Sequence, residues 1–282
     1  MTASCLENGP DVWLHALPRL DDDGCKYDRG HVLVLGGYPM TGAARLVARA
    51  AMRAGAGLTT VAVPMAAFAI YATALESIMV HPLASDGALP KLIDTRSFSA
   101  FVIGPGHGVG EATRRRVTAL LTTRKPIVLD ADALTSFAEN SPGLLPALHS
   151  DCVLTPHEGE FARLFACDGT KTDRAMKAAV LSGAIVVLKG RETCIAAPDG
   201  RRIINRYAPP TLATAGSGDV LAGIIAGLLA QGMPAFFAAA AGVWIHGAAA
   251  AMFGRGLIAD DLPDLLPKVL KQLDALVDIE RL

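Results

Sequence analysis

Residues 213–219 are the part of this sequence best suited to chemistry, because small residues lead to a single acid directly before an apolar stretch. Glycines allow backbone N–H groups to point into a concavity at a helix N-terminus, which binds anions such as a phosphoryl group. An acid would repel a phosphate that is merely bound, whereas Asp219 has a use there as the proton acceptor for an attacking hydroxyl. The structural alternative is that Ser217 or Asp219 caps the helix. On the catalytic interpretation, the anion hole consists of Ala215, Gly216, Ser217 and Gly218.

Other polar or glycine-rich segments follow predicted strands, where ligands gather in open parallel sheets. Each has a plain structural explanation as well: the glycine-rich stretch 104–108 would be a tight turn, and Lys189 a surface lysine. His157 would be a structural histidine, and its spacing from Glu160 is that of a capping box. Asp130 and Asp132 would be solvated loop residues or would hold a hydrated Mg²⁺ ion. Their joint placement at strand ends favours one shared cleft. The segments are Gly36-Gly37, 104–108, 130–132, 155–160 and Lys189-Gly190.

Short apolar runs alternate with segments of helical character along most of the chain. Such a pattern is typical of a mostly parallel sheet that helices cover on both faces. A β-hairpin is predicted around Pro198-Asp199-Gly200, and two long helices follow it. No linker or repeat interrupts residues 30–282, so we expect one α/β domain of roughly 250 residues. The predicted strands are 31–35, 58–63, 100–103, 126–130, 151–154, 184–188, 193–197 and 201–205, and the predicted helices are 43–54, 111–123, 171–182, 217–231 and 235–253.

The 282 residues carry 26 basic and 27 acidic side chains, a net charge of −1, and no basic stripe that would suit nucleic acid. The N-terminus lacks the basic and apolar regions of a signal peptide. Residues 220–253 contain no charged side chain, but Ala and Gly dominate, Pro234 interrupts the stretch and His246 lies within it. We therefore expect two buried helices rather than a membrane hairpin. The five cysteines are widely spaced and odd in number, which favours reduced thiols in the cytoplasm.

Several motifs in this order make the chain resemble the ribokinase-like superfamily and, within it, the ADP-dependent NAD(P)H-hydrate dehydratases, which repair damaged nicotinamide cofactors. The most specific are Thr155-Pro156-His157-Glu158-Gly159-Glu160 and residues 213–223, from Ala213 to Gly223. Further matches are segments 29–37, 41–44, 53–58, 103–106, 129–134 and 188–190. The resemblance covers residues 26–282. It implies a three-layer fold with a central, mostly parallel sheet and helices on both faces.

The resemblance also implies a reaction, in which ADP phosphorylates the C6 hydroxyl of (6S)-hydrated NADH or NADPH. Loss of phosphate then restores the ring double bond and leaves AMP, so that phosphate replaces hydroxide as the leaving group. Asp219 would be the base. Ala43, Gly106 and His157, together with Asp219, would bind the hydrated dinucleotide, and Glu160 would organise Mg²⁺ through water. The residues implied for ADP binding are Lys189, Gly190, Arg191, Glu192, Thr193 and Gly218.

The sequence departs from the family at two places. The usual Gly-Gly-Thr-Gly-Asp turn begins here with Ala215 and has Ser217 in place of Thr, and Glu158 replaces the common proline after the histidine. Ala215 requires a negative φ, and Ser217 keeps the hydroxyl, so the base and the anion hole are retained.

Residues 1–29 are expected to be irregular, and residues 1–25 to form a tail. The segment resembles the joint to an NAD(P)H-hydrate epimerase domain in fused relatives, so pairing with such an epimerase is implied. Relatives are often homotetramers, and a cytoplasmic homo-oligomer is implied for this chain too.

Two alternatives to the dehydratase stay open. An ATP-dependent small-molecule kinase of the same superfamily would release a stable phosphorylated product, although most such kinases carry Asn where His157 stands. A catalytically silent nucleotide-binding module would lack the acid in the anion turn, whereas Asp219 is present. No residue distinguishes ADP from ATP, or hydrated NADH from hydrated NADPH.

Overall fold

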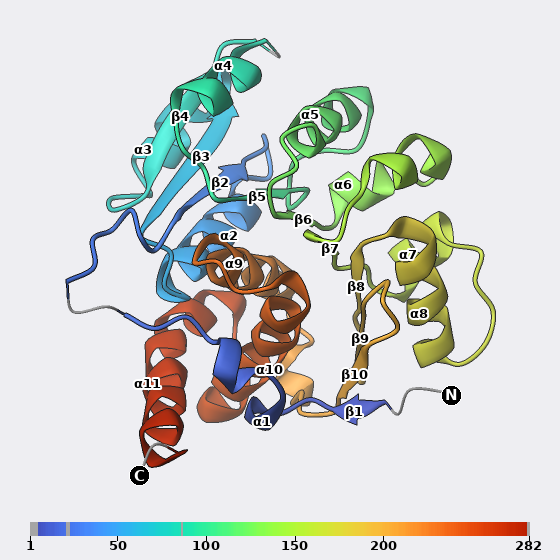
Figure 1. Cartoon of the computed structure of the whole chain (residues 1–282). Helices are drawn as coiled ribbons and strands as arrows, with labels where there is room; N and C mark the ends of the chain where they lie inside the picture. Colours follow the sequence, from blue (N-terminus) through green and yellow to red (C-terminus); the bar gives the residue numbers. More distant parts are fainter. Residues whose placement is uncertain (1–4, 21–22, 86, 281–282) are drawn as a thin grey trace.

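The computed structural model describes residues 5–20, 23–85 and 87–280, and ten strands in these ranges form one sheet (Figure 1). The strands are β1 (Leu6–Glu7), β2 (His31–Leu35), β3 (Leu58–Pro64), β4 (Met79–Leu83), β5 (Ala100–Ile103), β6 (Ile127–Leu129), β7 (Cys152–Leu154), β8 (Ile185–Leu188), β9 (Thr193–Ala196) and β10 (Arg202–Asn205). Their order is β1-β10-β9-β8-β7-β6-β5-β2-β3-β4. All neighbouring pairs are parallel except those that β9 makes with β8 and β10. The mostly parallel sheet and the hairpin predicted from the sequence are confirmed.

Helices pack on both faces of this sheet (Figure 1). They are α1 (Pro10–Trp13), α2 (Thr41–Arg53), α3 (Phe68–Ala72), α4 (Ala88–Thr95), α5 (Glu111–Leu121), α6 (Asp132–Thr135), α7 (Glu158–Leu164), α8 (Lys171–Ser182), α9 (Ser217–Ala230), α10 (Ala235–Phe253) and α11 (Leu262–Glu280). Successive side chains of a strand face opposite sides, so Val32 and Val34 of β2 lie in a core with α2, α9, α10 and α11. Leu33 and Leu35 lie in a second core with α5, α7 and α8. The predicted three-layer arrangement is therefore present.

Helices α2 and α9 run side by side because α9 carries glycines where their backbones meet. A Cβ atom on Gly223 would clash with the carbonyl oxygen of Val47, and one on Gly227 would lie 2.6 Å from that of Ala51. This order of contacts shows that the two helices run in the same direction. Since α2 follows β2, both helix N-termini lie at the edge formed by the carboxyl ends of the parallel strands.

Helix α10 is long and apolar enough to cross a membrane, but 67% of its most apolar window is buried inside the fold. Helix α9 is likewise buried from Val220 onward. The two helices pack against each other and against the sheet. Burial in a core accounts for the uncharged stretch, as the sequence predicts.

The N-terminal segment is more ordered than predicted. Strand β1 pairs in parallel with β10, and Trp13 is fully buried, with its ring 5.8 Å from that of Trp244. Asn8 donates to Asn205 Oδ1 at 2.9 Å and accepts from Trp13 Nε1 at 3.1 Å. The prediction of an irregular segment is therefore wrong for residues 6–16, because their partners lie about two hundred positions away in the chain. Residues 1–4 and 21–22 lie outside the described ranges, and the domain boundary at residue 25 stays a prediction.

Candidate active site

The turn that begins α9 presents backbone N–H groups without acceptors. Gly216 is the N-cap, with a left-handed φ of +86°, and no described side chain caps the helix. Ser217 Oγ instead donates a hydrogen bond of 2.7 Å to Leu212 O. The amides of Gly218 and Asp219 donate to no described residue, as expected for an anion site at a helix N-terminus. The predicted anion hole is wrong for the amide of Ser217, which donates to Thr214 O at 3.4 Å and so closes the turn. The alternative in which Ser217 or Asp219 caps the helix is therefore wrong.

Ala215 fits this turn without strain. Among the described residues other than glycine, positive φ angles occur at Arg124 and Ala131 and nowhere else. The backbone at Ala215 thus has the negative φ that an alanine requires in this position, and the turn keeps its form despite the substitution.

An ion pair lies beside the turn. Lys189 Nζ donates to Asp130 Oδ1 at 2.8 Å, and the two side chains are 20% and 2% exposed. A Cβ atom on Gly218 would lie 3.5 Å from Lys189 Nζ and 3.9 Å from Asp130 Oδ2, so the pair borders the unpaired amides. Burial alone would lower the pKa of Lys189, but neighbouring carboxylates, Asp130 foremost, raise it. Lys189 is thus a fixed positive charge in the site rather than a surface lysine.

Asp219 differs from the other acids here because its pKa is raised to about 7. Burial is the main cause of this raised pKa, the negative charge of Asp130 adds to it, and Lys189 opposes it. The carboxylate accepts no hydrogen bond from a described residue. A carboxyl group that exchanges its proton near neutral pH is suited to general-base catalysis, so the geometry and electrostatics agree with the role predicted for Asp219.

His157 and Glu160 form a capping box at the N-terminus of α7, as their spacing predicts. His157 Nδ1 accepts from the amides of Gly159 at 2.9 Å and Glu160 at 3.2 Å, while Glu160 Oε2 accepts from His157 N at 2.9 Å. This pattern assigns the proton of the neutral ring to Nε2, and the nearest carboxylate oxygen, Glu160 Oε1, is 3.6 Å from it. The side chain is 58% exposed. One ring nitrogen of His157 therefore serves the fold, and the other can reach a ligand.

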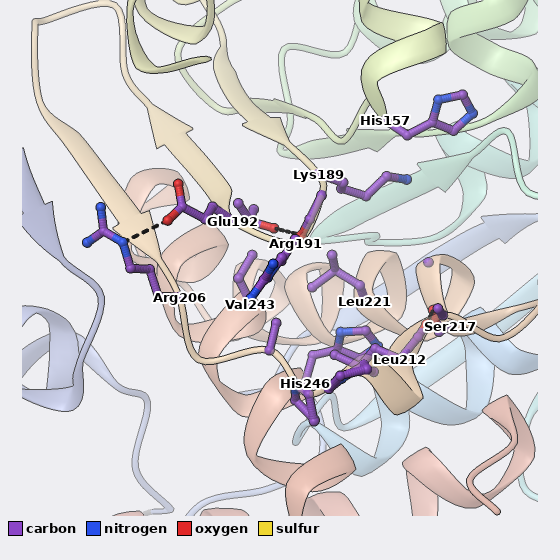
Figure 2. A pocket seen from close by; sticks show the side chains of 17 residues that line it. His157, Lys189, Arg191, Glu192, Arg206, Leu212, Ser217, Leu221, Val243 and His246 are labelled. Carbon is purple, nitrogen blue, oxygen red and sulfur yellow. Dashed lines mark hydrogen bonds and ion pairs between the residues drawn. The ribbon is translucent and has the colours of Figure 1, made fainter. Parts of the chain in front are cut away.

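A cavity of about 1090 Å³ opens between the loop after β8 and the start of α9. Figure 2 shows His157 and Lys189 on one side of it, and Leu212, Ser217 and His246 on another. The cavity is lined by every residue for which the sequence predicts ADP binding, namely Lys189, Gly190, Arg191, Glu192, Thr193 and Gly218. The structure thus brings these six residues together, while their contact with ADP stays a prediction.

Sequence reasoning missed the wall of the cavity that faces this loop. It includes Arg206, Pro209, Pro210, Leu212, Val243 and His246. Glu192 Oε1 accepts from Arg206 Nε at 2.9 Å (Figure 2), and Arg206 also pairs with Glu7. Burial lowers the pKa of His246 to about 4, so its ring is neutral. The sequence signal that could have indicated this wall is His246, a lone histidine in an uncharged stretch.

Ala43 and Gly106 meet on the α2 side of the same turn. Gly106 has a φ of +63°, and a Cβ atom there would lie 3.2 Å from Ala43 Cβ. Leu46, one helical turn further along α2, contacts the turn itself, since a Cβ on Gly216 would lie 2.8 Å from Leu46 Cδ1. Neither Ala43 nor Gly106 lines the large cavity. Ala43 and Gly106, which are predicted to bind the substrate, therefore lie apart from the residues predicted to bind ADP. The turn that carries Asp219 lies next to both groups.

Asp130 and Asp132 have different partners. Asp132 Oδ2 accepts from Gly108 N at 2.8 Å and so anchors the glycine-rich loop after β5. Within the described ranges, no group of three or more His, Cys, Asp or Glu side chains could by itself hold a metal ion. The five cysteines carry free thiols, and burial raises the pKa of Cys152 and of Cys194 to about 12.

Comparison with solved structures defines the class of protein. The fold matches a ribokinase-like superfamily protein of Enterococcus faecalis with a TM-score of 0.86 and 25% identity, over 95% of this chain and 96% of that one. It matches the ADP/ATP-dependent NAD(P)H-hydrate dehydratase of Bacillus subtilis, co-crystallized with ATP and Mg²⁺, with a TM-score of 0.84 and 27% identity, over 96% and 99%. The fold is ribokinase-like, as predicted.

The family follows from the sequence comparisons. The NAD(P)H-hydrate dehydratase model matches residues 32–271, and the chain belongs to this family. It is 38% identical to the ADP-dependent (S)-NAD(P)H-hydrate dehydratase of Neisseria meningitidis, over 88% of this chain and 87% of that protein. It is 39% identical to the bifunctional NAD(P)H-hydrate repair enzyme Nnr of Salinibacter ruber, over 94% of this chain and 53% of that protein. The chain thus spans about half the length of the bifunctional relatives that it matches.

Proposed function

We propose that this protein catalyses the ADP-dependent dehydration of (6S)-hydrated NADH and NADPH, which restores the reduced cofactor and yields AMP and phosphate. The observation that carries the proposal is the position of Asp219, whose pKa is near 7, beside unpaired amides at the start of α9. The cavity of about 1090 Å³ next to it has room for a nucleotide. The names of the relatives, which specify hydrated NAD(P)H and ADP, support the choice of substrates.

The proposed first stage is a phosphoryl transfer. Asp219 takes the proton of the C6 hydroxyl while the hydroxyl oxygen forms a bond to the β-phosphorus of ADP. The bond between this phosphorus and the bridging oxygen breaks, and AMP leaves. The amides of Gly218 and Asp219 and the ammonium group of Lys189 stabilise the negative charge on the phosphoryl oxygens. Because these groups are already in place, they need little rearrangement when the charge develops.

The proposed second stage is an elimination. C5 gives up a proton to solvent, the electron pair of that C–H bond forms the C5–C6 double bond of the reduced nicotinamide ring, and the C6–O bond breaks as phosphate departs with its electron pair. In this scheme Ala43, Gly106 and the Nε2–H of His157 hold the hydrated dinucleotide. ADP occupies the large cavity, against the residues from Lys189 to Thr193.

Mg²⁺ fits this site through water rather than through a dedicated set of ligands. The ion commonly binds one or two carboxylates, with waters and substrate phosphates completing its shell. Asp130 pairs with Lys189 through Oδ1, and Glu160 Oε2 accepts from the amide of His157, so that Glu160 Oε1 could hold a water of the hydrated ion. When bound, the ion would help to neutralise the charge of the transferring phosphoryl group.

The setting of the enzyme is proposed on the same basis. We place it in the cytoplasm as a homo-oligomer, as a tetramer on the family resemblance, with small-molecule substrates and neither nucleic acid nor membrane as a partner. The bifunctional repair enzymes among its relatives support a pairing with an NAD(P)H-hydrate epimerase.

The decisive experiment mixes the purified protein with hydrated NADH and either ADP or ATP. We expect ADP to restore the absorbance of the reduced nicotinamide, with release of AMP and phosphate. A rate with ATP that exceeds the ADP rate about tenfold or more would overturn the ADP assignment. A stable phosphorylated product would identify a kinase instead, and nucleotide binding without any turnover would identify a silent binding module.

A further inference from the structure

A second, smaller cavity lies beside the turn that carries Asp219. Its volume is about 340 Å³, and Gly42, Arg45, Leu46, Arg49, Ala74 and Asp260 are among its lining residues. It lies between the first turns of α2, the end of α3 and the 3₁₀ turn Ala259–Asp261. None of the residues predicted to bind ADP lines it, so it is separate from the nucleotide cavity.

Two side chains beside Gly216 connect this cavity to the turn. A Cβ atom on Gly216 would lie 2.8 Å from Leu46 Cδ1 and 3.1 Å from Ala259 Cβ. Leu46 lines the cavity, and Ala259 precedes Asp260, which also lines it. Oδ2 of Asp219 lies 3.8 Å from the same Cβ position. The lining residue Leu46 and the proposed base Asp219 are therefore both neighbours of Gly216.

The cavity also adjoins the predicted substrate residues. Gly42 lines it and directly precedes Ala43, which meets Gly106. The hydroxyl of Tyr71 donates to Gly37 O at 3.0 Å, and the charge of Arg45 is close enough to this tyrosine to oppose the rise of its pKa. A ligand whose reacting end lies at Asp219 and Ala43 can therefore extend towards Arg45.

The cavity is lined by two arginines, and they differ in whether a carboxylate pairs with them. Arg49 pairs with Asp264 at 3.3 Å, and the exposed Asp260 is the carboxylate that lines the cavity. Arg45 is half-buried, and no described residue accepts a hydrogen bond from its guanidinium group. A partly buried guanidinium fork without an acceptor is a strong binding group for a phosphate, which it can hold through two parallel hydrogen bonds.

We propose that this cavity is the subsite for a phosphate group of the dinucleotide substrate, with Arg45 as its main binding residue. The proposal rests on the function proposed above. A hydrated dinucleotide carries its pyrophosphate one ribose away from the reacting ring, and the NADPH form carries a further phosphate on the adenosine ribose. The ribose phosphate is a dianion and the pyrophosphate carries two negative charges in total. Either group would supply the acceptors that the described residues do not provide for Arg45.

The test compares Arg45→Gln with Arg53→Gln. Arg53 lies on the same helix and pairs with Asp264 at 3.2 Å, but it does not line the cavity. We expect Arg45→Gln to raise KM for the hydrated dinucleotide about tenfold or more, because a charge-assisted contact is lost. KM for ADP should stay within about twofold, since ADP binds in the other cavity. The Arg53→Gln variant should resemble the wild type for both substrates.

The two possible phosphates give different results. An equal rise in KM for hydrated NADH and hydrated NADPH would place the pyrophosphate at Arg45, and a rise confined to hydrated NADPH would place the ribose phosphate there. An unchanged KM for both substrates, or an equal change for ADP, would overturn the proposal.

Direct binding separates this proposal from the proposed function. We expect Arg45→Gln to weaken binding of a product, NADH or NADPH according to which phosphate is held, about tenfold in calorimetric titrations. Reduced nicotinamide riboside, which has no phosphate, should bind to both proteins alike. This measurement needs no turnover, so a wild type that fails to dehydrate would contradict the function alone. Equal binding of each product by wild type and variant would contradict the phosphate subsite alone.

Discussion

Lys189 Nζ lies 2.8 Å from Asp130 Oδ1, and the same ammonium group opposes the rise in the pKa of Asp219. Asp130 adds to that rise. The positive member of the ion pair therefore favours the ionised form of Asp219, and the negative member disfavours it. Burial is the main cause of the pKa of about 7 at Asp219, and the balance of these two charges modifies it. Removing one member of the pair should therefore change both the stability of the fold and the acidity of the base.

We expect Lys189→Met to lower both stability and turnover. Removal of one partner from a buried ion pair costs about 3–5 kcal/mol, because the other charge is left buried and unpaired. Thermal melting and steady-state rates measure the two effects. The double variant Asp130→Asn/Lys189→Met should recover much of the stability but not the turnover. A double variant as unstable as the single one would contradict the ion-pair explanation.

The activity of the wild type should rise with pH through about 7, because Asp219 accepts a proton only when it is ionised and its pKa is about 7. Below this pH, kcat/KM should fall by about tenfold per pH unit, as expected for one essential base. Stopped assays from pH 5 to 9 measure the profile. A profile that stays flat from pH 9 down to pH 5 would exclude Asp219, with its pKa of about 7, as the titrating base.

The two roles of His157 can be separated by two substitutions. Asparagine is a good N-cap, so His157→Asn should keep the melting temperature while it loses the Nε2–H, whereas His157→Ala should lose about 0.5–2 kcal/mol of stability as well. Both variants should raise KM for the hydrated dinucleotide more than KM for ADP. The lost interaction free energy with the dinucleotide is about 1–3 kcal/mol if a buried partner is left unpaired. Equal KM changes for both substrates would leave His157 with its structural role alone.

The sequence predicts the central sheet well because buried parallel strands are short apolar runs. The strands His31–Leu35 and Ala100–Ile103 and the helices Lys171–Ser182 and Ala235–Phe253 have the predicted bounds. The edge strand Met79–Leu83 was missed, since His81 and Pro82 break its apolar pattern and it has a single neighbour. The final helix Leu262–Glu280 was also missed, although its buried positions Leu262, Leu266, Val269 and Leu273 follow helical spacing; Pro267 interrupts the pattern.

The site is predictable only where its parts are local. The turn around Gly216 and the capping box of His157 and Glu160 are short motifs, and the structure has both. The raised pKa of Asp219 results mainly from burial, and Asp130 adds to it; Asp130 is far away in the chain and comes close through the packing of β6 against α9. The wall with Arg206 and His246 was missed for the same reason, because the hairpin and α10 bring it to the cavity.

Lys171 should act on ADP binding without touching ADP. Its Nζ donates to Lys189 O at 3.0 Å and pairs with Glu158 Oε1 at 3.3 Å, which fixes the start of the loop that lines the large cavity. We expect Lys171→Met to raise KM for ADP about threefold to tenfold, the loss of roughly one hydrogen bond, with KM for the hydrated dinucleotide unchanged. Lys177→Met, on the same helix but bonded to Asp168 O, is the matched control. Equal effects of the two variants would show that Lys171 merely stabilises α8.

Asp219→Asn should make the fold more stable at alkaline pH. The folded pKa of Asp219, about 7, lies above its ordinary value of 3.8, so the folded state holds the proton more tightly than the unfolded state does. Stability of the wild type therefore falls as pH rises through this window, and the loss is complete above pH 7. Asparagine carries no charge, so the variant should melt higher than the wild type at pH 8, by roughly 2–4 °C per kcal/mol gained. The two should melt together near pH 4, where the carboxyl is largely protonated in the folded state.

The same variant should lose nearly all turnover, and this result carries the proposed mechanism. Asparagine keeps the size of the side chain but cannot accept the hydroxyl proton, and a positioned base contributes about 10²- to 10⁴-fold in rate. Affinity for ADP should stay the same or increase, because a carboxylate is removed from beside the phosphates. Since α9 has no cap from the side chain of Asp219, Asp219→Ala should likewise show lost turnover without the stability loss of about 0.5–2 kcal/mol that removal of a cap would cause. Turnover, ADP titration and melting on these two variants test each point. An Asn variant that converts hydrated NADH to NADH within about threefold of the wild-type rate would contradict a base contribution of that size. The base would then have to be another group of the site.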